Sequence, residues 1–409
     1  MRSLVDQARA HPRCAGGREI PVAVIGAGPS GLAVAAELER RGIPATVFER
    51  SGQLGASWRD RYDGLRLHAA RSLSALPGLR LPRSRERWVS RDDLVRYLEA
   101  YVAHHELDVR LSTRVERIRP VEHDGGARSW RLCTGGTTAA ASTVVVATGR
   151  NQLPHVPDWP GADAFPGELI HSTRYRGPQP CAGRDVLVVG SGNSGAQIAV
   201  ALAEGGASRV RWSVRTPPNL VPATTGRLQR LSAALNALPP GAADLLTAAF
   251  TRLTLPDLTS RGVPRPQEGP RVRARRDGTS PVHDQGIVAA VLDGRVEPVA
   301  AVTAIEREQV VLADGSRISP DRIVAATGFR PGLERMFGAG PLLTGQGLPV
   351  PGGVPEAPNL HFVGFTHHPS EHVRQVGREA RTTARTIARG LRRAGGPNRT
   401  IDCRCTSVT

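Results

Sequence analysis

The chain contains two copies of one uncommon pattern, in which a short apolar β-branched run leads into the glycine spacing G-x-G-x-x-G and then an Ala-rich helical stretch. The first copy, VAVIGAGPSGLAVAAELERRGIPATVFER, spans residues 22–50, and the second, LVVGSGNSGAQIAVALAEGGASRVRWSVR, spans residues 187–215. A second apolar run closes each copy. Strand, turn, helix and second strand at this spacing predict a dinucleotide-binding unit, and here the whole pattern occurs twice.

Each glycine in such a loop has its own task. The first permits the tight turn, the second lets the backbone approach a pyrophosphate, and the third lets helix and strand pack closely, with the helix N-terminus aimed at the phosphates. We therefore predict cofactor contacts at Gly26, Gly28, Pro29, Ser30 and Gly31 in the first copy, and at Gly190, Gly192, Asn193, Ser194 and Gly195 in the second.

The end of the second strand differs between the copies. The first has Glu49, followed by Arg50, and a carboxylate there accepts hydrogen bonds from both hydroxyls of an adenosine ribose. The second has Arg215, with Arg211 nearby, and a guanidinium suits a 2′-phosphate that a carboxylate would repel. The first site should hold FAD or NAD and the second NADP. Because two dinucleotides in one chain imply electron transfer between them, FAD with NADPH is the natural pair.

Each unit closes on an apolar strand ending in the letters ATG: TVVVATGR at residues 143–150 and RIVAATGF at residues 322–329. Open α/β sheets bind ligands at the carboxyl ends of their strands, so Thr148 and Gly149, and likewise Thr327 and Gly328, should face cofactor. The stretch VVLADGSRI places a D-G turn between two strands and predicts a hairpin. We predict an α/β fold with two Rossmann-like dinucleotide-binding domains.

The order of these features predicts a FAD-binding domain with a NADPH-binding domain inserted into it. We expect flexible tails at residues 1–19 and 394–409, the FAD-binding domain in two parts at residues 20–164 and 329–393, and the NADPH-binding domain at residues 165–328. Residues 226–258 read as two short amphipathic helices split by Pro239 and Pro240. Such an insert could cap a substrate pocket, lie on a membrane surface or simply cover the sheet.

Composition excludes several classes of protein. The 409 residues carry a net charge of +17 with no lysine, so the chain has neither a lysine Schiff base nor a P-loop lysine. Aromatic residues make up 4%, and no nucleic-acid-binding motif is present, so we expect no nucleic-acid partner. The densest arginine cluster lies in a Pro/Gly-rich stretch that we interpret as a solvated loop, with an anionic carrier protein as the alternative partner: Arg271, Arg273, Arg275 and Arg276.

Cysteine usage and hydropathy point to a cytoplasmic protein. The five cysteines are scattered without a C-x-x-C pair, the first 19 residues have no apolar signal-peptide core, and no run of 18 apolar residues predicts a membrane span. His368 and His372 have the i, i+4 spacing of a metal pair, but a proline lies between them and no further ligand motif follows, so we expect no metal. The oligomeric state stays open.

The stretch FPGELIHSTRY, residues 165–175, resembles the F-x-G-x-x-x-H-x-x-x-[FY] fingerprint of class B flavin-dependent monooxygenases and lies between the two glycine loops as it does there. Tyr175 at its end is similar to the heteroatom-oxidising and YUCCA branches. Four further stretches look YUCCA-like: WRDRYDGLRLH (58–68), RPQEGP (265–270), SPVHDQG (280–286) and HFVGFT (361–366). The chain departs from that branch at Ala69 and Ala70 and in HHPSEHV, residues 367–373.

The resemblance implies an enzyme that uses FAD, NADPH and O2 to oxygenate a small molecule through a C4a-(hydro)peroxyflavin. It leaves open N- or S-oxygenation, ring expansion of ketones and keto-acid oxidation. By the motif His68 is the candidate catalytic side chain near flavin and nicotinamide, and His171 shapes the link between the domains. Further cofactor contacts carried over from the family are Gly55, Trp58, Arg59, Val115 and Gly364. An FAD/NADPH oxidoreductase without oxygen insertion is the alternative. A flavin disulfide reductase is excluded, because this chain lacks the redox dithiol that such an enzyme needs.

Overall fold

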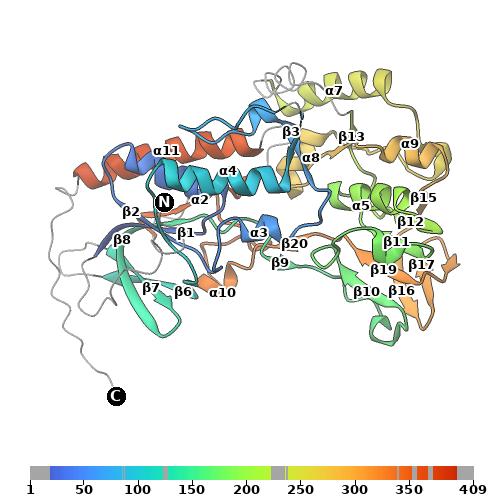
Figure 1. Ribbon diagram of the computed structural model, residues 1–409, viewed down its shortest axis with the longest axis horizontal. Coiled ribbons are helices and arrows are strands. Elements are labelled where there is room, and N and C mark those ends of the chain that lie inside the picture. Colours follow the sequence, from blue (N-terminus) through green and yellow to red (C-terminus); the bar gives the residue numbers. More distant parts are fainter. Residues whose placement is uncertain are drawn as a thin grey trace.

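Two sheets, each with its own helices, lie side by side along the long axis of the molecule (Figure 1). The computed structural model describes residues 19–84, 86, 88–122, 128–222, 235, 238–338, 340–351, 357–366 and 372–393. Every strand of the first sheet lies outside residues 165–328, and every strand of the second lies within that range. The predicted fold class, α/β with two Rossmann-like units, is confirmed.

The first sheet is built around the first glycine motif. Its parallel part runs in the order β5 (Asp108–Arg110), β2 (Ala45–Phe48), β1 (Ile20–Ile25) and β8 (Thr137–Val146). The amino half of β8 pairs with the antiparallel strand β7 (Arg128–Thr134), which in turn pairs with the antiparallel strand β6 (Arg117–Glu122). The helices of this unit are α2 (Pro29–Glu39), α3 (Ala56–Arg59), α4 (Arg91–His104) and α10 (Glu334–Phe337).

The C-terminal part of the chain returns to the first sheet. Strand β21 (Leu360–Phe362) pairs in parallel with β8, on the opposite side of β8 from β1. Helix α11 (His372–Arg393) packs against α2, where Val376 and Ala380 are buried in the same apolar cluster as Leu32. Segments from both ends of the sequence therefore form one core around the first glycine loop.

The second sheet has five parallel strands in the order β10 (Glu168–His171), β19 (Arg322–Ala325), β11 (Asp185–Val189), β12 (Arg209–Ser213) and β15 (Glu297–Val299). Helices α5 (Asn193–Glu204) and α9 (Ile287–Leu292) accompany it. A three-stranded antiparallel sheet follows β15, formed by β16 (Val302–Glu306), β17 (Gln309–Leu312) and β18 (Arg317–Ile318). The D-G turn joins β17 to β18, so the predicted hairpin is confirmed.

Three small strand pairs complete the described part of the fold. They are β3 (Arg66–Ala70) with β4 (Trp88–Ser90), β9 (Leu153–Pro154) with β20 (Phe329–Arg330), and β13 (Leu220–Val221) with β14 (Val282–His283). Strands β9 and β20 lie in the two segments that connect the sheets, because β9 follows the first ATG end and β20 follows the second. This pair holds the two connections together between the domains.

The helical insert is only partly described, and our prediction of a loop at the neighbouring arginine cluster is wrong. Helix α7 (Pro240–Thr254) begins at the Pro-Pro break as expected, whereas residues 223–234 and 236–237, which carry the first predicted helix, lie outside the described residues. The arginine cluster forms helix α8 (Pro270–Asp277) instead of a loop. Three of its four guanidiniums are held internally, since Arg271 pairs with Asp244, Arg273 donates to Pro217 O, and Arg276 pairs with Glu268.

No helix in the described part of the chain is long and apolar enough to cross a membrane.

Candidate functional site

The first glycine loop has the geometry of a phosphate cradle. Gly26 has a φ of +105°, which favours glycine, and a Cβ on Gly31 would come within 1.9 Å of Gly26 O. A Cβ on Gly28, by contrast, would meet nothing within 4 Å. The loop is thus tight where strand and helix meet and open at its middle glycine, above the N-terminus of α2, which is the side on which a pyrophosphate binds.

Glu49 lies at the carboxyl end of β2 and is held by the backbone. Its Oε2 accepts a hydrogen bond from Ala27 N at 2.9 Å, and its Oε1 accepts one from Ser51 N at 2.9 Å. Each carboxylate oxygen has a second lone pair left for a ribose hydroxyl. The side chain is therefore fixed beside the loop in the position that an adenosine ribose requires.

Two further groups suit a cofactor at this loop. Thr148 follows β8, and its Oγ1 is buried without a hydrogen-bond partner in the described structure. Gly364 follows β21 with a φ of +83°, and a Cβ there would come within 2.2 Å of Ser30 Oγ at the start of α2. Tight glycines, an open cradle and an unsatisfied hydroxyl together fit FAD at the first site.

The second loop repeats the geometry of the first. A Cβ on Gly195 would come within 1.9 Å of Gly190 O, and a Cβ on Gly192 would meet nothing within 4 Å. Gly190 has a φ of +124° and lies against the second ATG end, where a Cβ on Gly190 would come within 2.4 Å of Ala326 O. Asn193 turns its side chain toward β14, donating to Pro281 O and accepting from His283 N.

The two arginines near the carboxyl end of β12 differ in their surroundings. Arg211 is 6% exposed, and its Nη1 lies 2.5 Å from Asp185 Oδ1 at the amino end of the neighbouring strand. Arg215 is exposed just beyond the carboxyl end of β12 and forms no hydrogen bond or ion pair with the described residues. Its charge helps to lower the pKa of His155, after burial and Arg330. Arg215 is the guanidinium open to a 2′-phosphate.

The remaining residues carried over from the family lie around the first sheet. Gly55 is buried with a φ of +67° at the start of α3, Trp58 packs against the apolar core, and Val115 is 7% exposed in a second cluster. Arg59 is directed elsewhere, because its guanidinium pairs with Glu99 on α4 and donates to Leu54 O at 3.2 Å. Contact of these four with cofactor stays a prediction.

A polar network that the sequence did not predict joins the two domains. Tyr62 donates to Gln197 Oε1 on α5, Gln197 Nε2 donates to Gln285 Oε1 at 2.8 Å, and Gln285 Nε2 lies 3.3 Å from His68 Nδ1. The rings of His68 and His283 stack with centroids 5.2 Å apart and planes 7° from parallel. The motifs WRDRYDGLRLH and SPVHDQG carry four of these five residues, but their spacing in sequence does not reveal that they meet.

The network keeps His68 neutral. Burial, and then the neighbouring His283, lower the pKa of His68 to about 3. A neutral imidazole whose Nδ1 accepts from Gln285 carries its proton on Nε2. His68 is thus a hydrogen-bond donor of fixed orientation at the domain junction, and not an acid that titrates near neutral pH.

This environment makes the protein sensitive to acid. An unfolded histidine binds a proton below pH 6.5, whereas folded His68 does so only near pH 3, so the unfolded state is favoured as pH falls between these values. We expect the free energy of unfolding to decrease there by up to about 1.4 kcal/mol per pH unit from this one group. The measurement is urea unfolding of His68→Gln against wild type from pH 7 to pH 4.

In that series the free energy of unfolding of His68→Gln should change less steeply with pH than that of wild type, by the contribution of one bound proton. An identical slope in wild type and His68→Gln would contradict the neutral state of this side chain.

His171 connects the fingerprint to the second ATG end, in agreement with its predicted place at the domain link. Its Nδ1 accepts from Thr173 N, and its Nε2 donates to Gly328 O at 3.0 Å. Tyr175, in contrast, is 3% exposed within the core of the second unit, edge-on to Tyr62 at 6.0 Å. Because it is buried, Tyr175 has almost no surface with which to contact a substrate directly.

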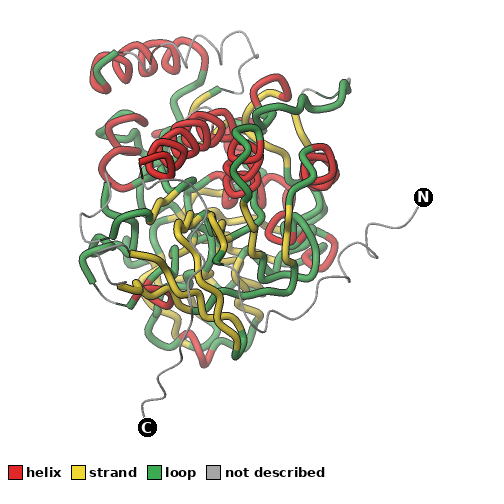
Figure 2. Tube along the Cα trace, turned by 90° about the vertical axis from the view of Figure 1, so that its left-hand side faces the viewer, coloured by secondary structure: helices red, strands yellow, loops and turns green. Residues whose placement is uncertain are grey.

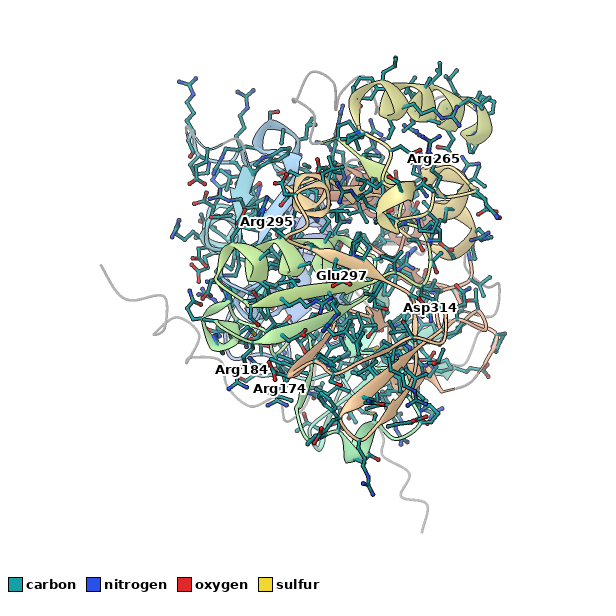
Figure 3. All side chains as sticks on the ribbon, turned by 90° about the vertical axis from the view of Figure 1, so that its right-hand side faces the viewer. Arg174, Arg184, Arg265, Arg295, Glu297 and Asp314 are labelled. Carbon is teal, nitrogen blue, oxygen red and sulfur yellow. The ribbon has the colours of Figure 1, made fainter. Side chains whose placement is uncertain are left out.

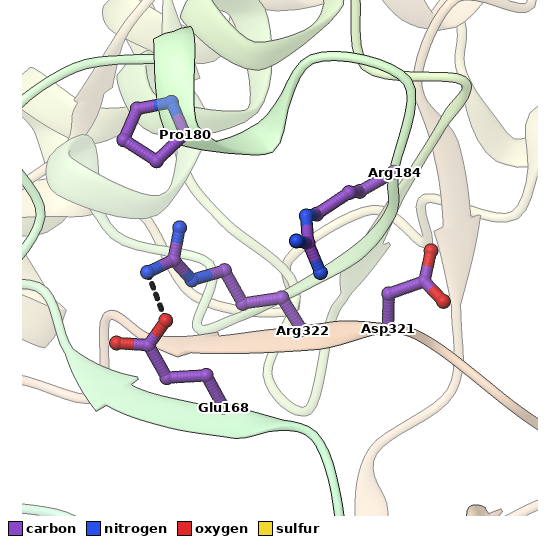
Figure 4. Close-up of a pocket in the computed structure, with 5 residues that line it drawn as sticks. All are labelled: Glu168, Pro180, Arg184, Asp321 and Arg322. Carbon is purple, nitrogen blue, oxygen red and sulfur yellow. Dashed lines mark hydrogen bonds and ion pairs between the residues drawn. The ribbon is translucent and has the colours of Figure 1, made fainter.

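Figure 4 shows a pocket that lies away from this chemistry. It is lined by Glu168, Pro180, Arg184, Asp321 and Arg322 and lies at the amino ends of β10, β11 and β19. Arg322 pairs there with Glu168 and donates to Cys181 Sγ at 3.3 Å. Ligands of open α/β sheets bind at the opposite, carboxyl edge, so we assign this pocket no part in cofactor binding.

In the described part of the chain, no cluster of His, Cys, Asp or Glu is arranged to hold a metal.

Comparison with known proteins agrees with these two cradles. The family model described as pyridine nucleotide-disulphide oxidoreductase matches residues 23–236. The indole-3-pyruvate monooxygenase YUCCA1 of Oryza sativa subsp. japonica is 38% identical over 85% of this chain and 87% of its own length. The probable indole-3-pyruvate monooxygenase YUCCA1 of Arabidopsis thaliana is 32% identical over 84% of each.

Solved structures show the same fold. A flavin-containing monooxygenase from Stenotrophomonas maltophilia superposes with a TM-score of 0.68 at 23% identity, covering 91% of this chain and 99% of that one. The open crystal structure of cyclohexanone monooxygenase gives 0.69 at 21% identity, covering 92% and 88%. A bacillithiol disulfide reductase from Staphylococcus aureus also reaches 0.65 at 17% identity, so the fold by itself does not separate these chemistries.

Fold and cradles define a flavoprotein oxidoreductase with two dinucleotide sites. Within that class, the chain belongs to the class B flavin monooxygenases and to their YUCCA-like branch. It is an FAD-dependent NADPH monooxygenase acting on a small molecule, which decides against the alternative without oxygen insertion. Held beside Gly28, Glu49 and Thr148, FAD would supply the acceptance of a hydride from NADPH and the activation of O2 that places one oxygen atom in the substrate and the other in water.

Proposed function

We propose that this enzyme oxygenates a 2-oxo acid with an apolar aryl group and releases its carboxyl group as CO2. The support from sequence is the rice relative, named for indole-3-pyruvate, which matches this chain along 87% of its length at 38% identity. The reaction balances as 2-oxo acid, O2, NADPH and a proton giving the acid shortened by one carbon, CO2, NADP+ and water.

The observation that carries this proposal is the environment of Arg150. Arg150 directly follows Thr148 and Gly149 of the first ATG end, and its Nη1 donates to Phe365 O at 3.3 Å. On the other side, its guanidinium lies against Gly278 at the end of α8, where a Cβ would come within 2.4 Å. It therefore lies between the first domain and the end of helix α8.

This guanidinium has no carboxylate within ion-pair distance among the described residues. Burial lowers its pKa, and the charge of Asp277 opposes that shift. A partly dehydrated cation gains most from an anion that binds it directly. The carboxylate of a 2-oxo acid supplies such an anion, beside the end of β8 where FAD is expected to bind.

The test measures NADPH consumption and CO2 release with aryl 2-oxo acids, amines, thioethers and cyclic ketones, with 18O2 as the oxygen source. We expect CO2 and label in the shortened acid for the 2-oxo acids. In Arg150→Gln the KM for the 2-oxo acid should rise roughly 10- to 150-fold, because a hydrogen bond to a charged group contributes about 1.5–3 kcal/mol. Arg295→Gln, an exposed arginine that pairs with Asp293, is the control and should match wild type.

Other products would overturn the proposal. Label in an N-oxide or sulfoxide without CO2 would favour heteroatom oxygenation, the alternative that Tyr175 suggested. Label found as a lactone or ester would favour carbonyl insertion. The cytoplasmic location, a carrier-protein partner, the domain boundaries and the individual cofactor contacts remain predictions.

A further inference from the structure

Helix α7 is amphipathic, but its apolar side faces solvent. The exposed fractions are 74% for Leu245, 52% for Leu246, 39% for Phe250 and 87% for Leu253. At 3.6 residues per turn these four side chains fall within one arc of roughly 140°, which also holds two exposed alanines. An ordinary surface helix of a globular protein has the opposite arrangement.

The inner side of α7 is polar and tied to the protein. Asp244 is 6% exposed, and its carboxylate accepts hydrogen bonds from Arg271 N at 3.0 Å and Val272 N at 2.9 Å, in the first turn of α8. The guanidinium of Arg271 reaches Asp244 at 3.4 Å and donates to Thr247 Oγ1 at 2.7 Å. The helix cannot rotate to bury its leucines without leaving this buried carboxylate and guanidinium unpaired.

The apolar surface is concentrated on this helix. The described residues include seven exposed large apolar side chains, of which five lie within residues 238–253 and a sixth, Val272, lies in the adjoining α8. α7 is the outermost helix along the top of the molecule and stands apart from the sheets (Figures 1 and 2). Seen from the side of the second sheet, it lies above Arg265 with side chains projecting outward (Figure 3). A contiguous apolar patch of this kind marks an interaction surface.

The charge of the molecule indicates which surface α7 meets. The net charge is +17, so a second copy of the chain would be repelled, whereas an anionic lipid surface would attract it. The exposed side of α7 carries a single charge, that of Arg252, and Arg275 on α8 adds a second, neither of them in an ion pair with a described residue. We propose that the apolar side of α7, defined by Leu245, Leu246, Phe250 and Leu253, docks the enzyme on an anionic lipid bilayer, lying in the interface without crossing it.

The experiment is flotation of the FAD-bound full chain with vesicles of phosphatidylcholine alone and of phosphatidylcholine with phosphatidylglycerol. We expect flotation with the anionic vesicles, weakened by 1 M salt, because the charge contribution is screened while the apolar one is not. The double variant Leu246→Gln with Leu253→Gln should lower the partition coefficient at least about 100-fold, since each leucine contributes about tenfold or more. Val156→Gln, which removes an exposed apolar side chain elsewhere, should leave partitioning unchanged.

NADPH oxidation in vesicle-free buffer should be the same in the double variant as in wild type, which separates docking from the chemistry. Three results would overturn the proposal. The first is no flotation of wild type with either vesicle. The second is a dimer in sedimentation velocity that the double variant dissociates, which would assign the surface to self-association. The third is a loss of thermal stability in the double variant together with no flotation of wild type, which would mean that the chain itself covers this side of α7.

Discussion

Purified Gly28→Ala enzyme should be colourless, while its first domain stays folded. Gly28 has a φ of −79° and a ψ of 178°, which alanine adopts without strain, and its Cβ would meet no protein atom within 4 Å. The space is open in the protein but lies where the backbone must approach a pyrophosphate. Loss of one or more backbone contacts to phosphate, each about 1.5–3 kcal/mol, should raise the Kd for FAD at least about tenfold.

Two companion variants separate cofactor loss from misfolding. Gly192→Ala makes the same change at the same geometry in the second loop, with a φ of −87° and no atom within 4 Å, so it should keep its flavin and lose affinity for NADPH. Gly31→Ala places a Cβ 1.9 Å from Gly26 O and should destabilise even the FAD-free protein by about 1–3 kcal/mol or more.

The measurements are the flavin absorbance of each purified variant, its Kd for FAD by titration, and its unfolding without cofactor. The unfolding free energy of FAD-free Gly28→Ala should lie within about 0.5 kcal/mol of wild type. A Gly28→Ala enzyme that retains its full yellow complement would show that the first loop does not hold the flavin.

Arg215→Ala should abolish most of the preference for NADPH over NADH. Arg215 is exposed at the carboxyl end of β12, and a charge-assisted contact to the 2′-phosphate contributes about 1.5–3 kcal/mol, so the KM for NADPH should rise roughly 10- to 150-fold. The KM for NADH, which lacks that phosphate, should be unchanged.

The matched control is Arg209→Ala, at the other end of the same strand, where the guanidinium is exposed and pairs with Glu297. It removes the same charge from β12 and should change neither KM. Steady-state rates of NADPH and NADH oxidation provide the comparison of the two KM values. An NADPH/NADH ratio that survives in Arg215→Ala would mean that a different group binds the phosphate, and Arg211 is a poor candidate because Asp185 already holds it.

Local spacing in the sequence was enough to predict both dinucleotide units. Each glycine of the two loops, the carboxylate of Glu49 and the D-G hairpin act on neighbours within a few residues or at the end of an adjacent strand, so the order of residues determines them directly. Helix α8 was open to the same logic but was missed. Pro270 at its first turn and Gly278 just past its end are helix boundary signals, which the run of arginines obscured.

Contacts between distant segments were decided only by tertiary packing. His68 and His283 lie 215 residues apart in sequence, and nothing in either motif states that their rings stack across the two domains. The same holds for Arg211, within β12, and Arg215, just beyond its end, of which the first is buried against Asp185 and the second is exposed. Alternation along β12 limits which side chains share a face, but the neighbouring strand determines which guanidinium is neutralised.

Helix α7 shows most clearly where prediction from the sequence ends. Its sequence determines that one side is apolar and the other small and polar, because residues three and four apart share a face. An amphipathic pattern ordinarily predicts that the apolar side faces the core. In the folded protein the carboxylate of Asp244 meets the amino end of α8 and holds the polar side inward. The sequence determined the two faces of this helix, and a single buried polar contact with another helix decided which of them faces the protein.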